Sequence, residues 1–282
     1  MPDIWTLAEM AGKLGLYVGV LAAAGTVIAA LVFRLEQYRW LAIGFACLGI
    51  VAASLVFSLR GANLTGDASG MIDLEMLGLL WSTPVGTALA LRLVGLGMLI
   101  LGLFLGSIGL WLSVLGGVLA IWSFDHVGHV AGRETFLLDI ALTFHLVTIA
   151  FWVGILTPLK RMASTAATYP MAAHVGHRFG KIASVVVPLL ALAGGFIGYR
   201  LIGSMSALLG TGYGQLLIVK VVLVATLLGL GAANKLRFIP SVQAGDAKAA
   251  NHLAGSITIE WIVFLLIFGV TAVLTTNSTL PM

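Results

Sequence analysis

Long apolar runs alternate with short polar stretches along the whole chain of 282 residues. Eight of these runs hold about 18 to 24 residues, enough for a helix to cross a hydrocarbon core roughly 30 Å thick. They cover residues 13–33, 40–60, 85–105, 108–124, 136–159, 180–202, 214–236 and 256–276. The pattern predicts an all-α integral membrane protein with about eight transmembrane helices, in a single polytopic domain over residues 1–282.

A short stretch of sequence recurs at the start of the third and the seventh predicted helices. When residues 83–92 are laid on residues 211–220, a threonine, a glycine, a leucine and a final basic residue coincide. The same offset places the first predicted helix on the fifth. We therefore predict an N-terminal four-helix half, 1–135, and a C-terminal four-helix half, 136–282. Because four is an even number, the two halves should be parallel repeats.

Composition agrees with a membrane protein. The chain is 60% hydrophobic and only 9% charged, with a mean hydropathy of +1.09, whereas a soluble protein carries roughly a quarter charged residues. The formal net charge of +4 comes from lysines and arginines between the spans. No basic tract with interleaved aromatic residues occurs, so we expect no nucleic-acid partner. The single Cys47 excludes an internal disulfide, and its apolar surroundings predict a packing residue.

Basic residues concentrate in every second connection between the predicted helices. The connections after the first, third, fifth and seventh helices hold Arg34, Arg39, Lys160, Arg161, Arg178, Lys181, Lys235, Arg237 and Lys248. The other connections hold only Arg60, Arg133 and Arg200, together with several acidic residues. The positive-inside rule places the first set in the cytoplasm. We therefore expect a multi-pass protein of a bacterial inner membrane with both termini in the periplasm.

One histidine is predicted to lie deep in the membrane. His145 follows Phe136 by nine residues, which at 1.5 Å per residue is about 14 Å into the fifth helix. Polar side chains are rarely tolerated at that depth without a function. A neutral imidazole there can bind a metal, relay a proton or simply donate a hydrogen bond to a neighbouring helix, and the sequence leaves these three roles open.

Further metal ligands are expected at the periplasmic side. His126 and His129 have the i, i+3 spacing that places two rings on one helix face, a geometry that suits copper or zinc. Met71 and Met76 lie in the long connection between the second and third predicted helices, and thioether sulfurs select Cu(I). Each group alone also fits a solvated helix end or lipid contact; their occurrence together with His145 favours a soft metal. The similar pair His174 and His177, on the predicted cytoplasmic side, fits solvated loop histidines better, and the sequence does not settle whether it binds metal.

Other charged residues fall inside the predicted spans. Arg92 and Lys220 are equivalent in the repeat, and each side chain should extend toward the periplasmic boundary or pair with Asp139. Glu260 lies near the cytoplasmic end of the last helix, where it could accept a hydrogen bond from Asn234 or Arg178, or hold a proton or cation. No nucleotide-binding loop, nucleophile elbow or HExxH motif is present, so we do not expect an enzyme.

Several of these residues form a recognisable set. The run 144–156 resembles the His-x6-Trp-x-Gly stretch of the copper resistance protein D family, and the runs 178–183 and 211–220, with Asn234 and Glu260, resemble later motifs of the same family. The positions that match are His145, Trp152, Gly154, Arg178, Lys220, Asn234 and Glu260, and His129 resembles an element before the fifth helix. Ile155, Gly180 and Leu142 depart from the family pattern.

The resemblance implies an inner-membrane protein that moves copper ions, as Cu(I) or Cu(II), from periplasm to cytoplasm, often with a small periplasmic copper-binding partner of the copper resistance protein C type. A second hypothesis is a redox protein with haem between two histidines. That role needs two imidazoles at matched depth, whereas the repeat counterpart of His145 is Tyr17. A third is a non-transporting subunit that delivers copper or assists assembly. The sequence does not determine the oligomeric state.

Overall fold

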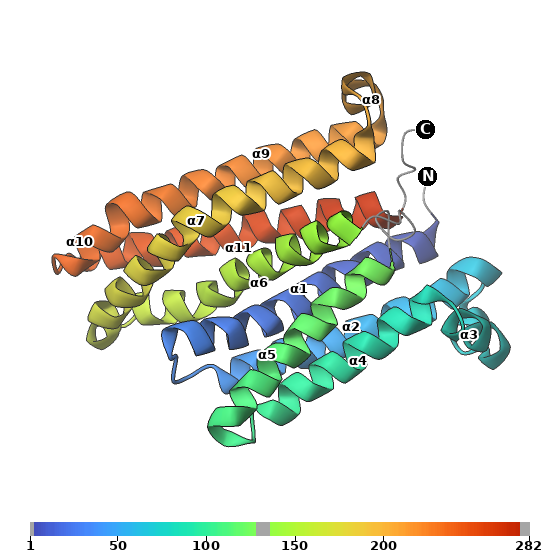
Figure 1. The fold of residues 1–282 in the computed structure, drawn as a ribbon, viewed down its shortest axis with the longest axis horizontal. Helices are drawn as coiled ribbons and strands as arrows, with labels where there is room; N and C mark the ends of the chain where they lie inside the picture. The colour runs from blue at the N-terminus through green and yellow to red at the C-terminus, as the bar shows by residue number, and fades with distance from the viewer. Residues whose placement is uncertain (1–2, 128–135, 277–282) are drawn as a thin grey trace.

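The structure, a computed structural model, describes residues 3–127 and 136–276. Every regular element in these two ranges is helical (Figure 1). The α-helices are α1 (Ile4–Phe33), α2 (Arg39–Thr65), α3 (Leu74–Trp81), α4 (Pro84–Gly102), α5 (Gly106–Trp122), α6 (Phe136–Ala163), α7 (Tyr169–Ile202), α8 (Met205–Gly210), α9 (Gly212–Ala233), α10 (Ile239–Gln243) and α11 (Ala247–Thr276). Short helical turns are η1 (Ala68–Met71), η2 (Ser123–His126) and η3 (Ala166–Thr168), and η4 (Asn234–Phe238) is a π-helix.

The predicted number of membrane spans is confirmed. Eight helices in the described ranges are long and apolar enough to cross a membrane. Three of them, α1, α7 and α11, begin nine or more residues earlier than the apolar runs. The first helix begins at Ile4, because the Asp3 side chain accepts a hydrogen bond of 2.7 Å from the Thr6 amide and caps it. The sixth span begins as a helix at Tyr169, well before residue 180, because a helix can extend beyond the lipid while hydropathy marks only the lipid-embedded part.

The first helix is the centre of the bundle. It packs against α2, α5, α6 and α11, and its three consecutive alanines, 22–24, are fully buried. Glycines bring α1 and α6 into backbone contact: a Cβ atom on Gly25 would lie 1.7 Å from the carbonyl oxygen of Ala150, and one on Gly154 would lie 1.9 Å from the carbonyl carbon of Gly25. Such close approach of small residues is typical of helix packing in membranes.

Two long helices lie at one edge of the bundle. In Figure 1, α7 and α9 form an outer layer beyond α6 and α11, and most of their apolar surface faces outward. That surface suits contact with lipid. Cys47 of α2 is also exposed, so the expectation that it packs in the interior was wrong. The helix around Cys47 is apolar on every face, and the small thiol lies on the outward one.

The repeated sequence has the same local role in both places. Thr83 and Thr211 are N-caps, accepting hydrogen bonds from the amides of Val85 (3.2 Å) and Gly214 (3.0 Å). A Cβ on Gly86 would lie 2.1 Å from the Trp81 carbonyl oxygen, and one on Gly214 would lie 2.2 Å from the Leu208 carbonyl oxygen. Each motif thus folds a short helix, α3 or α8, back on the span that follows. The division into parallel four-helix halves stays a prediction.

The two ends of the bundle are distinct. Figure 1 shows the start of α1, the end of α11 and the short helices α3 and α8 at one end, with α10 and the α1–α2 and α4–α5 connections at the other. The start of α1 and the end of α11 are joined there, since Lys13 Nζ donates to the Thr275 carbonyl oxygen at 3.1 Å. We refer to these as the α3 end and the α10 end.

Candidate functional site

Three helices meet around a buried carboxylate near the middle of α11. Glu260 is 2% exposed. The indole Nε1 of Trp152, from α6, donates to its Oε2 at 2.8 Å, and Asn234 Nδ2, at the start of η4, donates to its Oε1. Three of the seven residues that resembled family positions, Trp152, Asn234 and Glu260, therefore converge in space. Among the described residues Glu260 has no ion-pair partner, which is unusual for a carboxylate in a membrane.

The expected alternative partner of Glu260 lies elsewhere. Arg178 of α7 donates from Nη2 to the Val32 carbonyl oxygen at 3.1 Å, and its guanidinium lies 5.6 Å from the Phe33 ring centroid. Of the two partners that the sequence suggested for Glu260, the structure selects Asn234. Arg178 instead holds the α10 ends of α1 and α7 together.

A cavity of about 150 Å³ lies beside the carboxylate, between α6, α7, α9 and α11. Trp152, Asn234 and Glu260 line it together with Lys235, whose Nζ donates to Ser184 Oγ. The buried Oδ1 atom of Asn234 has no hydrogen-bond partner among the described residues. Asn234 also begins a π-helical segment, a rare conformation that often occurs at functional positions.

His145 faces the outer layer of helices. A Cβ on Gly194 of α7 would lie 3.0 Å from its Cε1 and 3.3 Å from its Nδ1, so the ring occupies the space that this glycine leaves free. The Nδ1 atom is buried and has no hydrogen-bond partner in the part of the chain that the structure describes. The ring of this α6 residue is therefore packed against α7.

A second group of polar atoms lies where α5 ends, at the α3 end of the bundle. Thr143 Oγ1 of α6 donates to Asp125 Oδ2 at 2.6 Å. Asp125 Oδ1 and His126 Nδ1 are buried without a partner among the described residues, and the His126 ring meets Trp122 edge-on at 5.2 Å. Asp139 lies one helical turn before Thr143 in the first turn of α6. His129 lies outside the described residues.

The structure does not bring all predicted ligands to one place. Thr143, which contacts Asp125, and His145 are two positions apart on α6, so their side chains point about 200° apart around the helix. His126 and His145 therefore lie toward different faces of α6. No group of three or more His, Cys, Asp or Glu side chains suited to a metal occurs within residues 3–127 and 136–276.

The methionines and the other histidines are also separate from His145. Met71 ends η1 and Met76 lies in α3, and both are half-buried at the α3 end. His174 and His177 lie on the first turns of α7 and are exposed. They belong to a helix, whereas the sequence suggested a loop.

The expected behaviour of the two repeat-equivalent cations was wrong for Arg92. Its side chain does not extend to the boundary: the residue is 6% exposed, its Nε donates to Ser123 Oγ at 2.9 Å, and its guanidinium lies 4.8 Å from the Phe124 ring centroid. No ion pair joins Arg92 or Lys220 to Asp139 in the described ranges. Arg92 is held inside because η2, the turn that follows α5, presents a hydroxyl and an aromatic face to its guanidinium.

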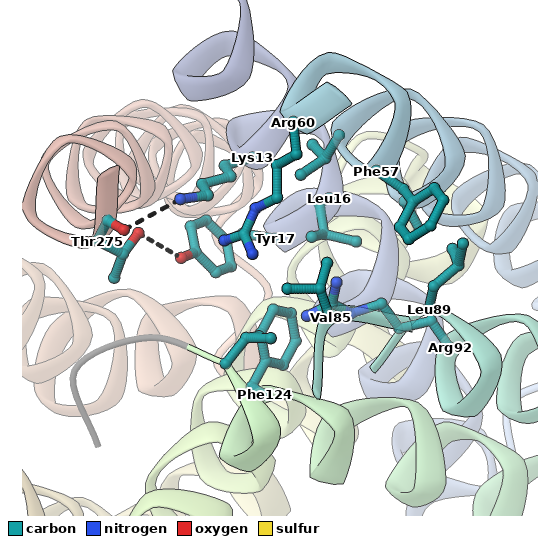
Figure 2. Close-up of a pocket in the computed structure, with 13 residues that line it drawn as sticks. Lys13, Leu16, Tyr17, Phe57, Arg60, Val85, Leu89, Arg92, Phe124 and Thr275 are labelled. Carbon is teal, nitrogen blue, oxygen red and sulfur yellow. Dashed lines mark hydrogen bonds between the residues drawn. The ribbon is translucent and has the colours of Figure 1, made fainter. Parts of the chain in front are cut away.

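Sequence reasoning missed a cluster of charges next to Arg92. Glu9 Oε1 contacts Lys13 Nζ at 3.1 Å and Arg60 Nε at 3.3 Å, and Glu9 and Lys13 are 5% and 7% exposed. The first apolar run begins after Glu9 and the second ends at Arg60, so hydropathy places both residues outside the spans. The Glu-x3-Lys spacing, typical of a helical ion pair, was the signal that α1 begins earlier. Figure 2 shows Lys13, Arg60 and Arg92 around a cavity between α1, α2, α4, η2 and the end of α11.

Comparison with protein-family models agrees with the motif resemblance. Residues 1–139 match the model described as copper resistance protein D-like, N-terminal domain, and residues 173–274 match the model described as copper resistance protein D. The chain belongs to the copper resistance protein D family. Searches of curated proteins and of solved structures found no match.

As a member of this family, the chain is a multi-pass membrane protein associated with copper resistance. The matched regions include most of the residues that carried the resemblance, among them Arg178, Lys220, Asn234 and Glu260. His145 and Trp152 fall between the two matched regions. Trp152 is tied to the family set by its hydrogen bond to Glu260, whereas the role of His145 rests on its place in the fold.

Proposed function

We propose that this member of the copper resistance D family moves copper ions across a bacterial inner membrane, from periplasm to cytoplasm. One observation carries the proposal: His126 and His145 each hold a buried Nδ1 atom without a hydrogen-bond partner among the described residues. A buried polar atom left unpaired costs about 1–3 kcal/mol, so such atoms point to a function. An unprotonated imidazole nitrogen is a common ligand of copper.

The first contact with copper is proposed at the α3 end. Asp125 Oδ1 and His126 Nδ1 belong to neighbouring residues, and both atoms are buried and unpaired. His129, Met71 and Met76 are proposed to complete the capture of copper there, with the methionine sulfurs suited to Cu(I). We propose that a periplasmic copper-binding protein of the copper resistance C type delivers the ion to this end.

His145 is proposed as the next copper-binding site along the route. It lies on a different face of α6 from the capture group, so the ion passes around α6 to reach it. A route made of separate, incomplete sites suits transport, because an ion must bind well enough to enter and weakly enough to leave. Glu260, a carboxylate without an ion-pair partner beside a cavity of about 150 Å³, attracts cations that come from His145.

Copper accumulation in cells that express the protein tests the proposal. We expect His145→Ala and His126→Ala each to lower accumulation several-fold, toward the level of cells without the protein. The matched control is His252→Ala, since His252 is exposed at the start of α11 and should leave accumulation unchanged. Equal accumulation by wild type and His145→Ala at equal protein level would remove His145 from the route. If cells with the wild-type protein accumulate less copper than cells without it, the protein moves copper in the opposite direction to the one proposed.

The two other hypotheses give different results with purified protein. A haem protein would show a Soret band, and a delivery or assembly subunit without its own copper site would bind no copper in equilibrium dialysis. We expect no Soret band, and we expect copper binding that weakens in the paired His126→Ala, His145→Ala variant. A Soret band, or dialysis that finds no copper bound to the wild type, would contradict a copper-transport role.

A further inference from the structure

We infer that the cavity in Figure 2 is a binding site for a phosphate-type oxyanion, at the α3 end of the N-terminal half. The cavity has a volume of about 50 Å³ and is lined from several helices by Lys13, Tyr17, Arg60, Arg92, Phe124 and Thr275, with apolar side chains between them. Phe124 and Val127, which line the cavity, flank the proposed copper-capture residues Asp125 and His126, but the positive charge of the cavity does not suit a copper ion.

The charges around the cavity do not balance. Lys13, Arg60 and Arg92 are cations, and Glu9 is the only acid in contact with any of them among the described residues. Three positive charges and one negative charge leave an excess of two. An uncompensated charge within a membrane is unfavourable, so this excess calls for a negatively charged ligand.

The hydrogen bonds of the three cations show which groups are available to that ligand. Lys13 Nζ is fully used: it contacts Glu9 Oε1 (3.1 Å), the Thr275 carbonyl oxygen (3.1 Å) and Thr276 Oγ1 (2.7 Å). The two arginines bond only through Nε, to Glu9 Oε1 (3.3 Å) and to Ser123 Oγ (2.9 Å). Their four Nη atoms have no acceptor in the described part of the chain.

Figure 2 shows both guanidinium groups turned into the cavity, Arg60 from α2 beside Tyr17 and Arg92 from α4 beside Phe124. Two forked donors that face one space can each give paired hydrogen bonds to the oxygens of a phosphate group. The Arg92 guanidinium is also fixed in place by its bond to Ser123 and its contact with the Phe124 ring, 4.8 Å away. The donors are therefore set before the ligand arrives.

The size of the cavity limits the ligand. A volume of about 50 Å³ exceeds the roughly 10–15 Å³ that one water molecule needs and suits one compact oxyanion. The phosphate oxygens can belong to free inorganic phosphate or to the headgroup of an anionic phospholipid, whose chains would lie outside the cavity. Both sources present the same oxygens to the arginines, and an experiment separates them.

The test uses the full-length protein in detergent. Equilibrium dialysis with radiolabelled inorganic phosphate measures the free ion, and native mass spectrometry measures retained anionic phospholipid. We expect the wild type to hold about one phosphate group per chain in one of these two forms. Arg60→Gln and Arg92→Gln should each lower that occupancy at least tenfold. The matched control is Arg39→Gln, which removes an exposed arginine at the other end of α2 and should change nothing.

Two results would overturn the inference. In one, the wild type holds neither inorganic phosphate nor an anionic lipid; in the other, Arg39→Gln loses as much as Arg60→Gln. Arg92→Gln places a neutral group in a buried position and can fail to fold. Arg60, with a side chain that is 27% exposed, can lose its charge with less disturbance, so Arg60→Gln alone decides the outcome in that case.

Discussion

At the scale of single residues, the contact of Trp152 with Glu260 has the clearest consequence. The indole donates at 2.8 Å to a carboxylate that is 2% exposed. Replacing Trp152 with Phe keeps an aromatic ring against Phe264, whose centroid is 5.8 Å away, but removes the donor. A buried acceptor left unpaired costs about 1–3 kcal/mol. We expect Trp152→Phe to lower the unfolding temperature in detergent, measured by circular dichroism.

The same change at an exposed tryptophan is the control. Trp111 of α5 is 60% exposed, and Trp111→Phe should leave the unfolding temperature unchanged. The loss should also depend on Glu260, so that Trp152→Phe costs less in a Glu260→Gln background than in the wild type. If Trp152→Phe behaves like Trp111→Phe, the hydrogen bond does not contribute to stability.

A second residue-scale prediction concerns Thr143. Its hydroxyl donates to Asp125 Oδ2 at 2.6 Å and so orients the carboxylate next to His126. Thr143→Val keeps the shape of the side chain and removes the donor. We expect copper affinity, measured by dialysis, to fall several-fold as the Asp125 carboxylate loses its orientation. Thr258→Val is the control, since that hydroxyl only bonds back within α11; equal losses in both would exclude a specific role for Thr143.

At the scale of elements, the contact of α1 with α6 depends on glycine. A Cβ on Gly25 would lie 1.7 Å from the Ala150 carbonyl oxygen, which is part of the backbone and cannot move alone. Gly25→Ala therefore pushes two helices apart, and overpacking of this kind costs about 1–3 kcal/mol or more. We expect a clear fall in unfolding temperature. Gly97→Ala in α4 meets no atom within 4 Å and should be neutral; equal effects would contradict the close contact.

The π-helix η4 gives a second prediction for an element. It holds one more residue than an α-helical path would need. Deleting Leu236, which is 73% exposed, removes the extra residue and lets α9 continue as an α-helix with Ile239 close to its present angle. Ile239 therefore stays against Gly176, where a Cβ would lie 2.2 Å from Ile239 Cδ1. Deleting Leu228 from the regular part of α9, which has no extra residue to lose, turns Ile239 by about 100° instead. We expect the Leu228 deletion to lower the unfolding temperature far more than the Leu236 deletion; equal losses would contradict this account of the bulge.

At the scale of the whole molecule, orientation in the membrane can be tested directly. The start of α1 and the end of α11 lie at one end of the bundle, and the basic connections predict that this end is periplasmic (Figure 1). Alkaline phosphatase, which is active only outside the cytoplasm, should be active when fused after Met282 and inactive when fused after Gly245. A green fluorescent protein fusion should give the opposite pattern. If only the fusion after Gly245 shows phosphatase activity, the protein has the opposite orientation in the membrane.

Much of the fold was predictable from the sequence. Eight apolar runs were enough to predict eight spans, because lipid allows a crossing chain few structures other than a helix. The site was only partly predictable. Trp152, Asn234 and Glu260 were identified by their resemblance to family positions, and Asn234 was one of the two partners expected for Glu260, but nothing in the sequence pointed to the contact of Glu260 with Trp152. The cluster of Glu9, Lys13 and Arg60 was missed, because the first apolar run begins at Lys13, after Glu9, and the second ends at Arg60.

The sequence alone determined the features that depend on residues close together in the chain: the lipid-crossing helices, their number, and the threonine caps that begin α4 and α9. Tertiary structure alone decided which buried polar atoms meet, because contact across helices depends on rotation and depth, which a run of apolar residues leaves undefined. It placed His126 and His145 toward different faces of α6. It also brought Glu260 into contact with Trp152 and Asn234, and placed Arg60 and Arg92 around one cavity. The physical reason is that hydropathy measures transfer into lipid, whereas a site is made by the directions of side chains.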